Sequence, residues 1–236
     1  MSIKDLTQKS FSVLIIRSFG VLLLFGFTLF ITNFFTPENV GRYDFVRSTI
    51  MVLGGLALMG TNQSIIYYSG LLKARKSVES IRIIYFKMLR IIFALSLIIL
   101  GLFVGIFNEA TILQIFKSEE SFSLILKSIF TLIFFSTTML NIDTMRALEK
   151  TILSEMYRSL FRYLPVFVFA IILLKTNRQS LLVEAYLLGF ILLSIFSFVR
   201  VFALLSKLET PRDDSENFSV KEIFKTSAPM ALHYPF

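Results

Sequence analysis

Six long apolar runs, separated by short polar connections, dominate the hydrophobic pattern of this chain. They cover residues 11–35, 45–70, 83–107, 122–142, 157–174 and 181–206. The first run is 25 residues long, and a helix of that length, rising about 1.5 Å per residue, crosses a hydrocarbon core of about 30 Å. No connection is long enough to hold a separate globular domain. The pattern therefore predicts six transmembrane helices.

The polar segment that follows the first run has the features of a helix start. Thr36 can cap a helix N-terminus, Pro37 suits its first turn, and Glu38 favours the positive end of the helix dipole. We expect a tight turn between the first two helices here.

Composition agrees with a membrane protein. Hydrophobic residues make up 55% of the chain and charged residues only 17%, which is too apolar for a soluble domain of this size. There is no Cys and one His, so we expect no disulfide, metal or cofactor. The net charge of +8 does not indicate nucleic-acid binding, because no soluble basic domain accompanies it. We predict an all-α integral membrane protein built as a six-helix bundle.

Lysine and arginine fall mainly on one side of the predicted bundle. If the six runs cross the membrane in turn, 17 of the 24 basic residues lie on the N-terminal side and six on the opposite side, with Arg17 inside the first run. Because basic loops are retained in the cytoplasm, the N-terminus is expected to be cytoplasmic.

Arg17 is the first candidate for a functional residue. An arginine in lipid costs about 3–15 kcal/mol unless it faces protein, water or a head group. With Gly20, Leu24, Thr28 and Thr32 it forms one face of the first helix. Two interpretations stay open: Arg17 extends to the interface while this face packs against a neighbour, or the face lines a hydrated cavity.

The second and fourth runs carry similar polar faces. Arg47 and Thr61 share a face of the second helix, Asn62 and Gln63 lie near its inner end, and Thr138 belongs to a weaker series on the fourth. Close helix packing, a head-group anchor at Arg47 and a helix-to-helix hydrogen bond at Asn62 or Gln63 are the simpler explanations. The alternative is that these residues and Arg17 line one cationic cavity that binds substrate.

The connection between the fourth and fifth runs is rich in charge. Asp143 and Arg146 are three residues apart, and Arg158 and Arg162 are four apart and share a helical face near Glu155. Arginine pairs suit phosphate oxygens, so these residues are candidates for a cytoplasmic entrance. An ordinary positive anchor at the membrane surface is the simpler alternative.

Enzymatic activity is not expected. The chain has no glycine-rich phosphate loop, no acidic pair on an outer connection, and no serine with a base in reach. Every carboxylate is expected at or beyond the end of an apolar run. A transporter driven by an ion gradient or the membrane potential fits these features better than an enzyme or a nucleotide-hydrolysing pump.

Several short motifs resemble those of polysaccharide flippases. They are Arg17 to Gly20 followed by the hairpin at residues 35–43, the run at residues 146–150 with Arg158 downstream, and Ser227-Ala228-Pro229-Met230. The chain is similar in these motifs to the O-antigen type flippases of the multidrug, oligosaccharidyl-lipid and polysaccharide exporter superfamily. The opening hairpin is the most specific of them.

The resemblance implies the N-terminal lobe of an inverted-V transporter with twelve or more helices. Residues 1–206 would form this lobe, residues 207–220 a cytoplasmic linker, and residues 221–236 the start of a second lobe at which the chain is truncated. Such a protein would lie in the inner (cytoplasmic) membrane among membrane lipids. It would pass a lipid-linked oligosaccharide, carried on polyprenyl pyrophosphate, to the outer leaflet by alternating access. The resemblance also implies cooperation with glycosyltransferases and a polymerase of the same pathway, and it does not identify a coupling ion.

Three other functions stay open. A multidrug exporter of the same superfamily would more often bury carboxylates that bind cations, which the predicted positions of the acids disfavour. An O-antigen polymerase or ligase would be a membrane enzyme with a large outer loop rich in Arg and His, and no outer connection here exceeds about 15 residues. A purely structural subunit predicts that Arg17→Ala leaves polysaccharide export intact.

Overall fold

The computed structural model describes residues 3–209 and 218–233, and every regular element in these ranges is a helix. In chain order they are α1 (Ile3–Phe34), α2 (Pro37–Leu58), α3 (Thr61–Ala74), η1 (Val78–Ser80), α4 (Ile81–Ile106), α5 (Glu109–Phe116), α6 (Ser121–Ala147), α7 (Thr151–Met156), η2 (Tyr157–Phe161), α8 (Leu164–Lys175), η3 (Gln179–Leu181), α9 (Leu182–Leu205) and α10 (Val220–His233). The element η2 is a π-helical turn, and η1 and η3 are 3₁₀ turns. The all-α prediction is confirmed for this part of the chain.

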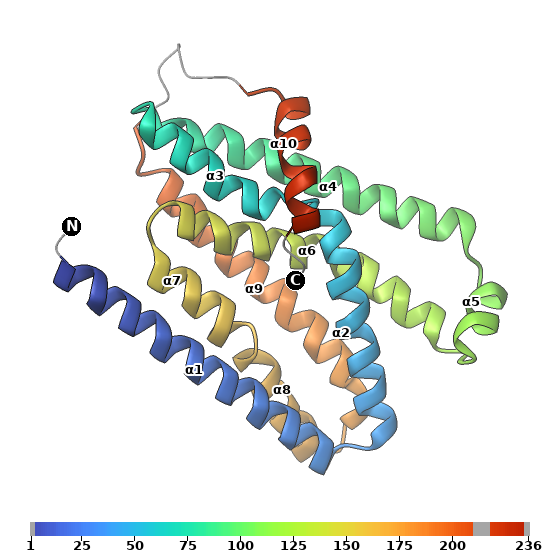
Figure 1. The fold of residues 1–236 in the computed structure, drawn as a ribbon. Helices are drawn as coiled ribbons and strands as arrows, with labels where there is room; N and C mark the ends of the chain where they lie inside the picture. The colour runs from blue at the N-terminus through green and yellow to red at the C-terminus, as the bar shows by residue number, and fades with distance from the viewer. Residues whose placement is uncertain (1–2, 210–217, 234–236) are drawn as a thin grey trace.

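Helix α6 is the centre of the fold. It packs against α2, α3, α4 and α9, while α1 lies along α7, η2 and α8 (Figure 1). Apolar side chains of α6 belong to three buried clusters. Leu140 packs with residues of α3 and α4, Phe135 with residues of α2 and α9, and Ile129 with residues of α4 and α5. These contacts place the polar residues of α6 in the interior of the bundle.

Five helical segments are long and apolar enough to cross a membrane, and a sixth is counted if the bent pair α2 and α3 is one span. The second predicted helix, over residues 45–70, is not one unbroken helix but is divided into α2 and α3. Met59 and Gly60 both adopt positive φ, and the two helices meet at 42°. These apolar helices indicate a membrane-embedded, multi-pass protein.

The start of α2 follows the sequence signals closely. Thr36 is the N-cap and its hydroxyl oxygen accepts a hydrogen bond from the Asn39 backbone N–H, Pro37 occupies the first turn, and Glu38 lies in that turn as well. The residues from Pro37 onward are helical, so the turn is as tight as expected. The predicted hairpin between the first two helices is confirmed.

Helix α10 lies across α3 at the bend between α2 and α3 (Figure 1). The hydroxyl groups of Ser64 and Ser227 are 2.6 Å apart and buried. A Cβ on Gly60 would lie 2.2 Å from the Ser227 carbonyl oxygen, so this close approach requires glycine. Most of the predicted linker, residues 210–217, lies outside the described residues.

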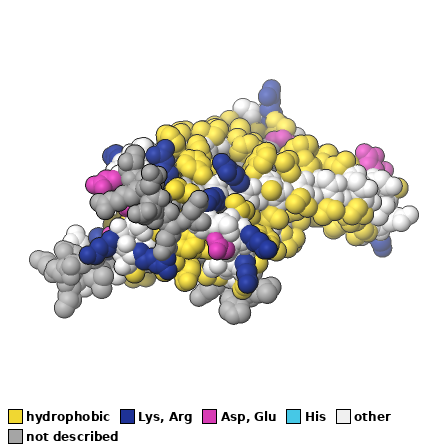
Figure 2. All heavy atoms as spheres, turned by 90° about the horizontal axis from the view of Figure 1, so that it is seen from above, with side chains coloured by type: hydrophobic (Ala, Val, Ile, Leu, Met, Phe, Trp, Pro, Cys, Tyr) yellow, Lys and Arg dark blue, Asp and Glu magenta, His cyan; other side chains and the backbone are white. Residues whose placement is uncertain are grey.

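The surface is largely apolar. Figure 2 shows hydrophobic side chains over much of one face, with Lys and Arg concentrated in its left and central parts. On α1, Phe11, Phe19 and Phe25 are more than half exposed, as expected for a helix that faces lipid or another protein surface. Burial inside the chain therefore leaves a wide apolar face on α1.

Candidate functional site

A cavity of about 300 Å³ opens at the bend between α2 and α3. It lies between α3, α6, η2 and α10, and combines polar groups with methionine and phenylalanine side chains. Its lining residues are Met51, Asn62, Gln63, Phe135, Met139, Asp143, Arg158, Arg162, Met230 and Ala231. Five residues predicted separately as cavity or entrance candidates therefore meet in one place.

The bend in the second span positions the amides of this cavity. Because Gly60 ends the break in a left-handed conformation, α3 restarts at Thr61 and presents Asn62 and Gln63 in its first turn. A straight helix would have carried these residues onward in the direction of α2. The break is thus the local feature that brings the amides to α6.

Asp143 is the buried acid of the cavity, with 3% of its surface exposed. Its Oδ2 accepts a hydrogen bond from Asn62 Nδ2 at 3.1 Å, and its Oδ1 forms an ion pair with Arg158 Nη2. A buried carboxylate is stabilised only when it is paired and hydrogen-bonded. Because both oxygens are engaged, Asp143 holds Arg158 in place at the cavity.

Arg162 is the cation of the cavity that has no acidic partner. Its guanidinium lies 5.7 Å from the ring centres of Phe135 and Phe190 and 5.6 Å from that of Tyr163. Among the described residues, no carboxylate lies within 4.0 Å of it. Aromatic faces stabilise the cation without neutralising it, so a positive charge remains available at this wall.

The π-helical turn η2 sets the direction of both arginines. Arg158 lies within this turn and Arg162 directly follows it, and both reach the cavity. Single π turns inside helices often occur at functional sites. Arg158 and Arg162 are four residues apart, and both line the cavity, as the prediction of a shared face expected.

Arg17 does not simply extend to an interface. Its Nε and Nη2 contact Glu155 Oε1 and Oε2 at 2.9 and 3.1 Å, and Ser159 Oγ donates to Glu155 Oε1 at 2.8 Å. Gly20, one turn further along, packs directly against Ser159. This half of the predicted face of helix one therefore packs against α7 and η2.

The other predicted candidates lie apart from the cavity. Thr28 is exposed, its hydroxyl donates to the Leu24 carbonyl of its own helix, and it is not among the residues that line this cavity. Arg146 is exposed on α6 and is not among the residues that line the cavity. Arg47 is half-buried and pairs with Asp44 at 3.3 Å on its own helix.

Two buried threonines are also explained by local structure. The Thr61 hydroxyl donates to the Leu58 carbonyl at the bend, and the Thr138 hydroxyl donates to the Phe134 carbonyl on α6. Each hydroxyl is thus engaged within or next to its own helix. Close packing accounts for both positions, as the simpler interpretation of the polar faces proposed.

The expectation that every carboxylate lies at or beyond a helix end is wrong. Asp143 is one turn inside α6, and Glu155 is buried in α7. The sequence pattern missed both, because the apolar run ends at residue 142 while the helix continues to Ala147. The spacing of Asp143 and Arg146, just after the apolar run, was the signal that could have indicated a helix continuing past residue 142.

A polar chain inside the bundle was also missed. Tyr85 donates its hydroxyl proton to Asn141 Oδ1 at 2.6 Å, and Asn141 Nδ2 donates to Ser197 Oγ at 2.9 Å. It joins α4, α6 and α9 through fully satisfied side chains. This arrangement holds three helices in register.

The comparisons give no relative. No family model, curated protein or solved structure matches this chain. Within the part of the chain that the structure describes, no group of His, Cys, Asp or Glu is arranged to hold a metal ion. Function is therefore argued from the cavity alone.

Proposed function

We propose that this chain is the N-terminal lobe of a flippase that carries a lipid-linked oligosaccharide across the membrane. The observation that carries the proposal is Arg162, a cavity cation without an acidic partner among the described residues. An anionic pyrophosphate needs such a group, because a bare charge is very costly in an apolar medium. Asn62 and Gln63 add amide donors for its oxygens.

The size of the cavity limits what it holds. About 300 Å³ accommodates a pyrophosphate head group and a little of its first sugar, whereas a whole oligosaccharide is larger. In the proposed transporter, the second lobe supplies the opposite wall. Met230 and Ala231 of α10, which already line the cavity, mark the side from which that lobe approaches.

Buried acids are the observation that favours the runner-up, a multidrug exporter of the same superfamily. Asp143 and Glu155 resemble the carboxylates that such proteins use for cations. Both, however, are held by arginines, Asp143 by Arg158 and Glu155 by Arg17. The uncompensated charge of the cavity is positive, which favours an anionic substrate. No catalytic step is proposed.

The test is export in cells that depend on the full protein. Arg162→Ala, Arg162→Lys and wild type are expressed in a strain that lacks the gene, and surface polysaccharide is quantified at equal membrane levels. Losing a charged hydrogen-bonding partner costs about 1.5–3 kcal/mol, roughly tenfold or more in binding. We expect Arg162→Ala to lose most export and Arg162→Lys to retain a measurable part.

Arg178→Ala is the matched control, because Arg178 is an exposed arginine in the connection between α8 and η3. It should export like wild type. Wild-type export by Arg162→Ala contradicts the flippase proposal. Loss of resistance to cationic drugs, with surface polysaccharide unchanged in a full deletion, supports the multidrug exporter instead.

A further inference from the structure

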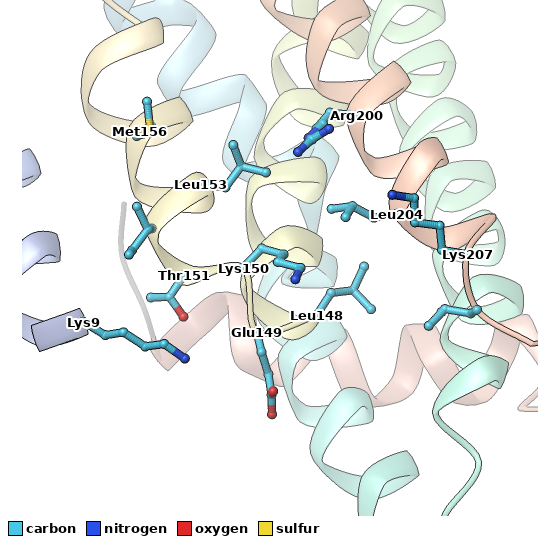
Figure 3. Close-up of a pocket in the computed structure, with 12 residues that line it drawn as sticks. Lys9, Leu148, Glu149, Lys150, Thr151, Leu153, Met156, Arg200, Leu204 and Lys207 are labelled. Atoms are coloured by element: carbon cyan, nitrogen blue, oxygen red, sulfur yellow. The ribbon is translucent and has the colours of Figure 1, made fainter. Parts of the chain in front are cut away.

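A second hollow, of about 770 Å³, lies between α1, α7 and the end of α9. Figure 3 shows Lys9 reaching in from α1, Lys150 from the connection before α7, and Arg200 and Lys207 from α9 and the residues after it. The full lining is Lys9, Leu148, Glu149, Lys150, Thr151, Ile152, Leu153, Met156, Arg200, Leu204, Lys207 and Leu208. It shares no residue with the cavity that contains Arg162.

The charge of this cleft is strongly positive. Within the described residues, Lys9, Lys150, Arg200 and Lys207 have no carboxylate within 4.0 Å. The one acid of the lining, Glu149, is held by the Lys73 ammonium at 2.7 Å, which lowers the pKa of that carboxyl. Four cations and one acid line the cleft, and an anion bound among the cations lowers their mutual repulsion.

The walls of the cleft are aliphatic. Leu148, Leu153 and Leu204 lie among the cations in Figure 3, with Met156 beyond them. The three helical segments that form the cleft are all candidate membrane spans, and the cations lie at or near the same end of each. That end is where the head groups of a bilayer would lie.

We propose that this cleft binds one anionic phospholipid. The phosphate lies among Lys150, Arg200 and Lys207, and the acyl chains follow Leu153 and Leu204 toward the exposed apolar face of α1. Basic clusters between transmembrane helices at the head-group level are suited to acidic lipids. A soluble nucleotide is a poorer fit, because the lining offers no aromatic side chain on which a base stacks.

The proposal gives the bound lipid a structural position. Its phosphate bridges α9 to the connection between α6 and α7, and Lys9 adds α1 to the same anion. The lipid thereby offsets repulsion between the cations of these segments. This lipid site is independent of the substrate that the protein carries.

The experiment uses the full protein in nanodiscs of phosphatidylcholine, with or without phosphatidylglycerol, and counts retained lipid by native mass spectrometry. Wild type should retain one phosphatidylglycerol in preference to phosphatidylcholine. The variant Lys150→Gln/Arg200→Gln should lose that preference by roughly tenfold or more. The control Lys175→Gln/Arg178→Gln removes the same charge from two exposed residues elsewhere and should retain the lipid like wild type.

Circular dichroism and gel filtration of each variant establish that it is folded before retention is compared. Equal retention of the two lipids by wild type overturns the proposal, as does unchanged retention in the folded Lys150→Gln/Arg200→Gln variant. Millimolar glycerol phosphate and inorganic phosphate form a further arm. Displacement of the lipid by either one indicates a soluble-anion site and also overturns it.

Discussion

The ion pair between Arg17 and Glu155 joins a side chain that is 55% exposed to one that is 6% exposed. Loss of one partner is therefore expected to affect the stability of the fold differently from loss of the other. Arg17 keeps contact with its surroundings, whereas Glu155 is taken out of contact with them and depends on Arg17 and Ser159 for its hydrogen bonds. A buried acceptor that loses its partner costs more than the pair itself contributes.

Removing only the arginine should therefore be more harmful than removing both charges. We expect Arg17→Gln to destabilise the folded protein by about 1–3 kcal/mol, and Arg17→Gln/Glu155→Gln to recover part of that loss. Thermal unfolding in detergent measures both, and Glu155→Gln completes the double-mutant cycle. Strictly additive effects would show that the pair is not coupled.

At the scale of single elements, the contact of α1 with η2 depends on the absence of a side chain at Gly20. A Cβ there would lie 2.5 Å from Ser159 Cβ and 2.7 Å from the Ser159 carbonyl oxygen. Gly26, on the same helix, has nothing within 4 Å of the same position. The two glycines thus differ only in what they face.

Alanine at these two positions should act with opposite sign. Gly20→Ala forces α1 away from η2, and overpacking of this kind costs about 1–3 kcal/mol. Gly26→Ala should stabilise by about 0.5–1 kcal/mol, because alanine favours the helix. The melting temperature of each variant is compared with that of wild type. An equal rise in both variants would exclude close packing at Gly20.

The bend between α2 and α3 shows how one element can be decided by packing. Met59 and Gly60 take positive φ, yet residues 45–70 form an unbroken apolar run. Gly60 alone does not break a helix, and Gly54 and Gly55 lie within α2 without doing so. The close approach of Ser227 to Gly60 is a contact that no local pattern reports.

For the whole molecule, the distribution of basic residues predicts that the connection before α4 and the connection after α5 lie on opposite sides of the membrane. Lys76 and Lys117 mark these two places. Both are exposed and adopt almost the same left-handed backbone, with φ of 55° and 54°. The chain has no native Cys, so a single introduced thiol is unique.

Labelling of intact cells with an impermeant maleimide tests the orientation. Lys117→Cys should react from outside, and Lys76→Cys only after the membrane is opened. Because the two positions match in exposure and backbone, their difference reports sidedness rather than local structure. The reverse pattern would place the N-terminus outside, and reaction of both in intact cells would contradict the α4 span.

The sequence by itself determined the features that depend on neighbouring residues. Apolar runs of sufficient length gave the helices and the membrane-embedded class, and Thr36-Pro37-Glu38 gave the start of α2, because capping and burial in lipid act within a few turns. The apolar runs did not give the helix ends. Polar residues such as Asp143 continue α6 beyond its apolar run, since the protein interior rather than lipid surrounds them.

Only the tertiary structure decided which polar groups meet. Asn62 and Asp143 are 81 residues apart, and Arg17 and Glu155 are 138 apart. Their pairing depends on the bend at Gly60, the π turn before Arg162 and the central position of α6. The sequence singled out Asn62, Gln63, Asp143, Arg158 and Arg162, which line one cavity. Long-range packing decided that Arg162, and not Arg17, keeps an uncompensated charge there, because a buried charge takes whichever partner the fold brings to it.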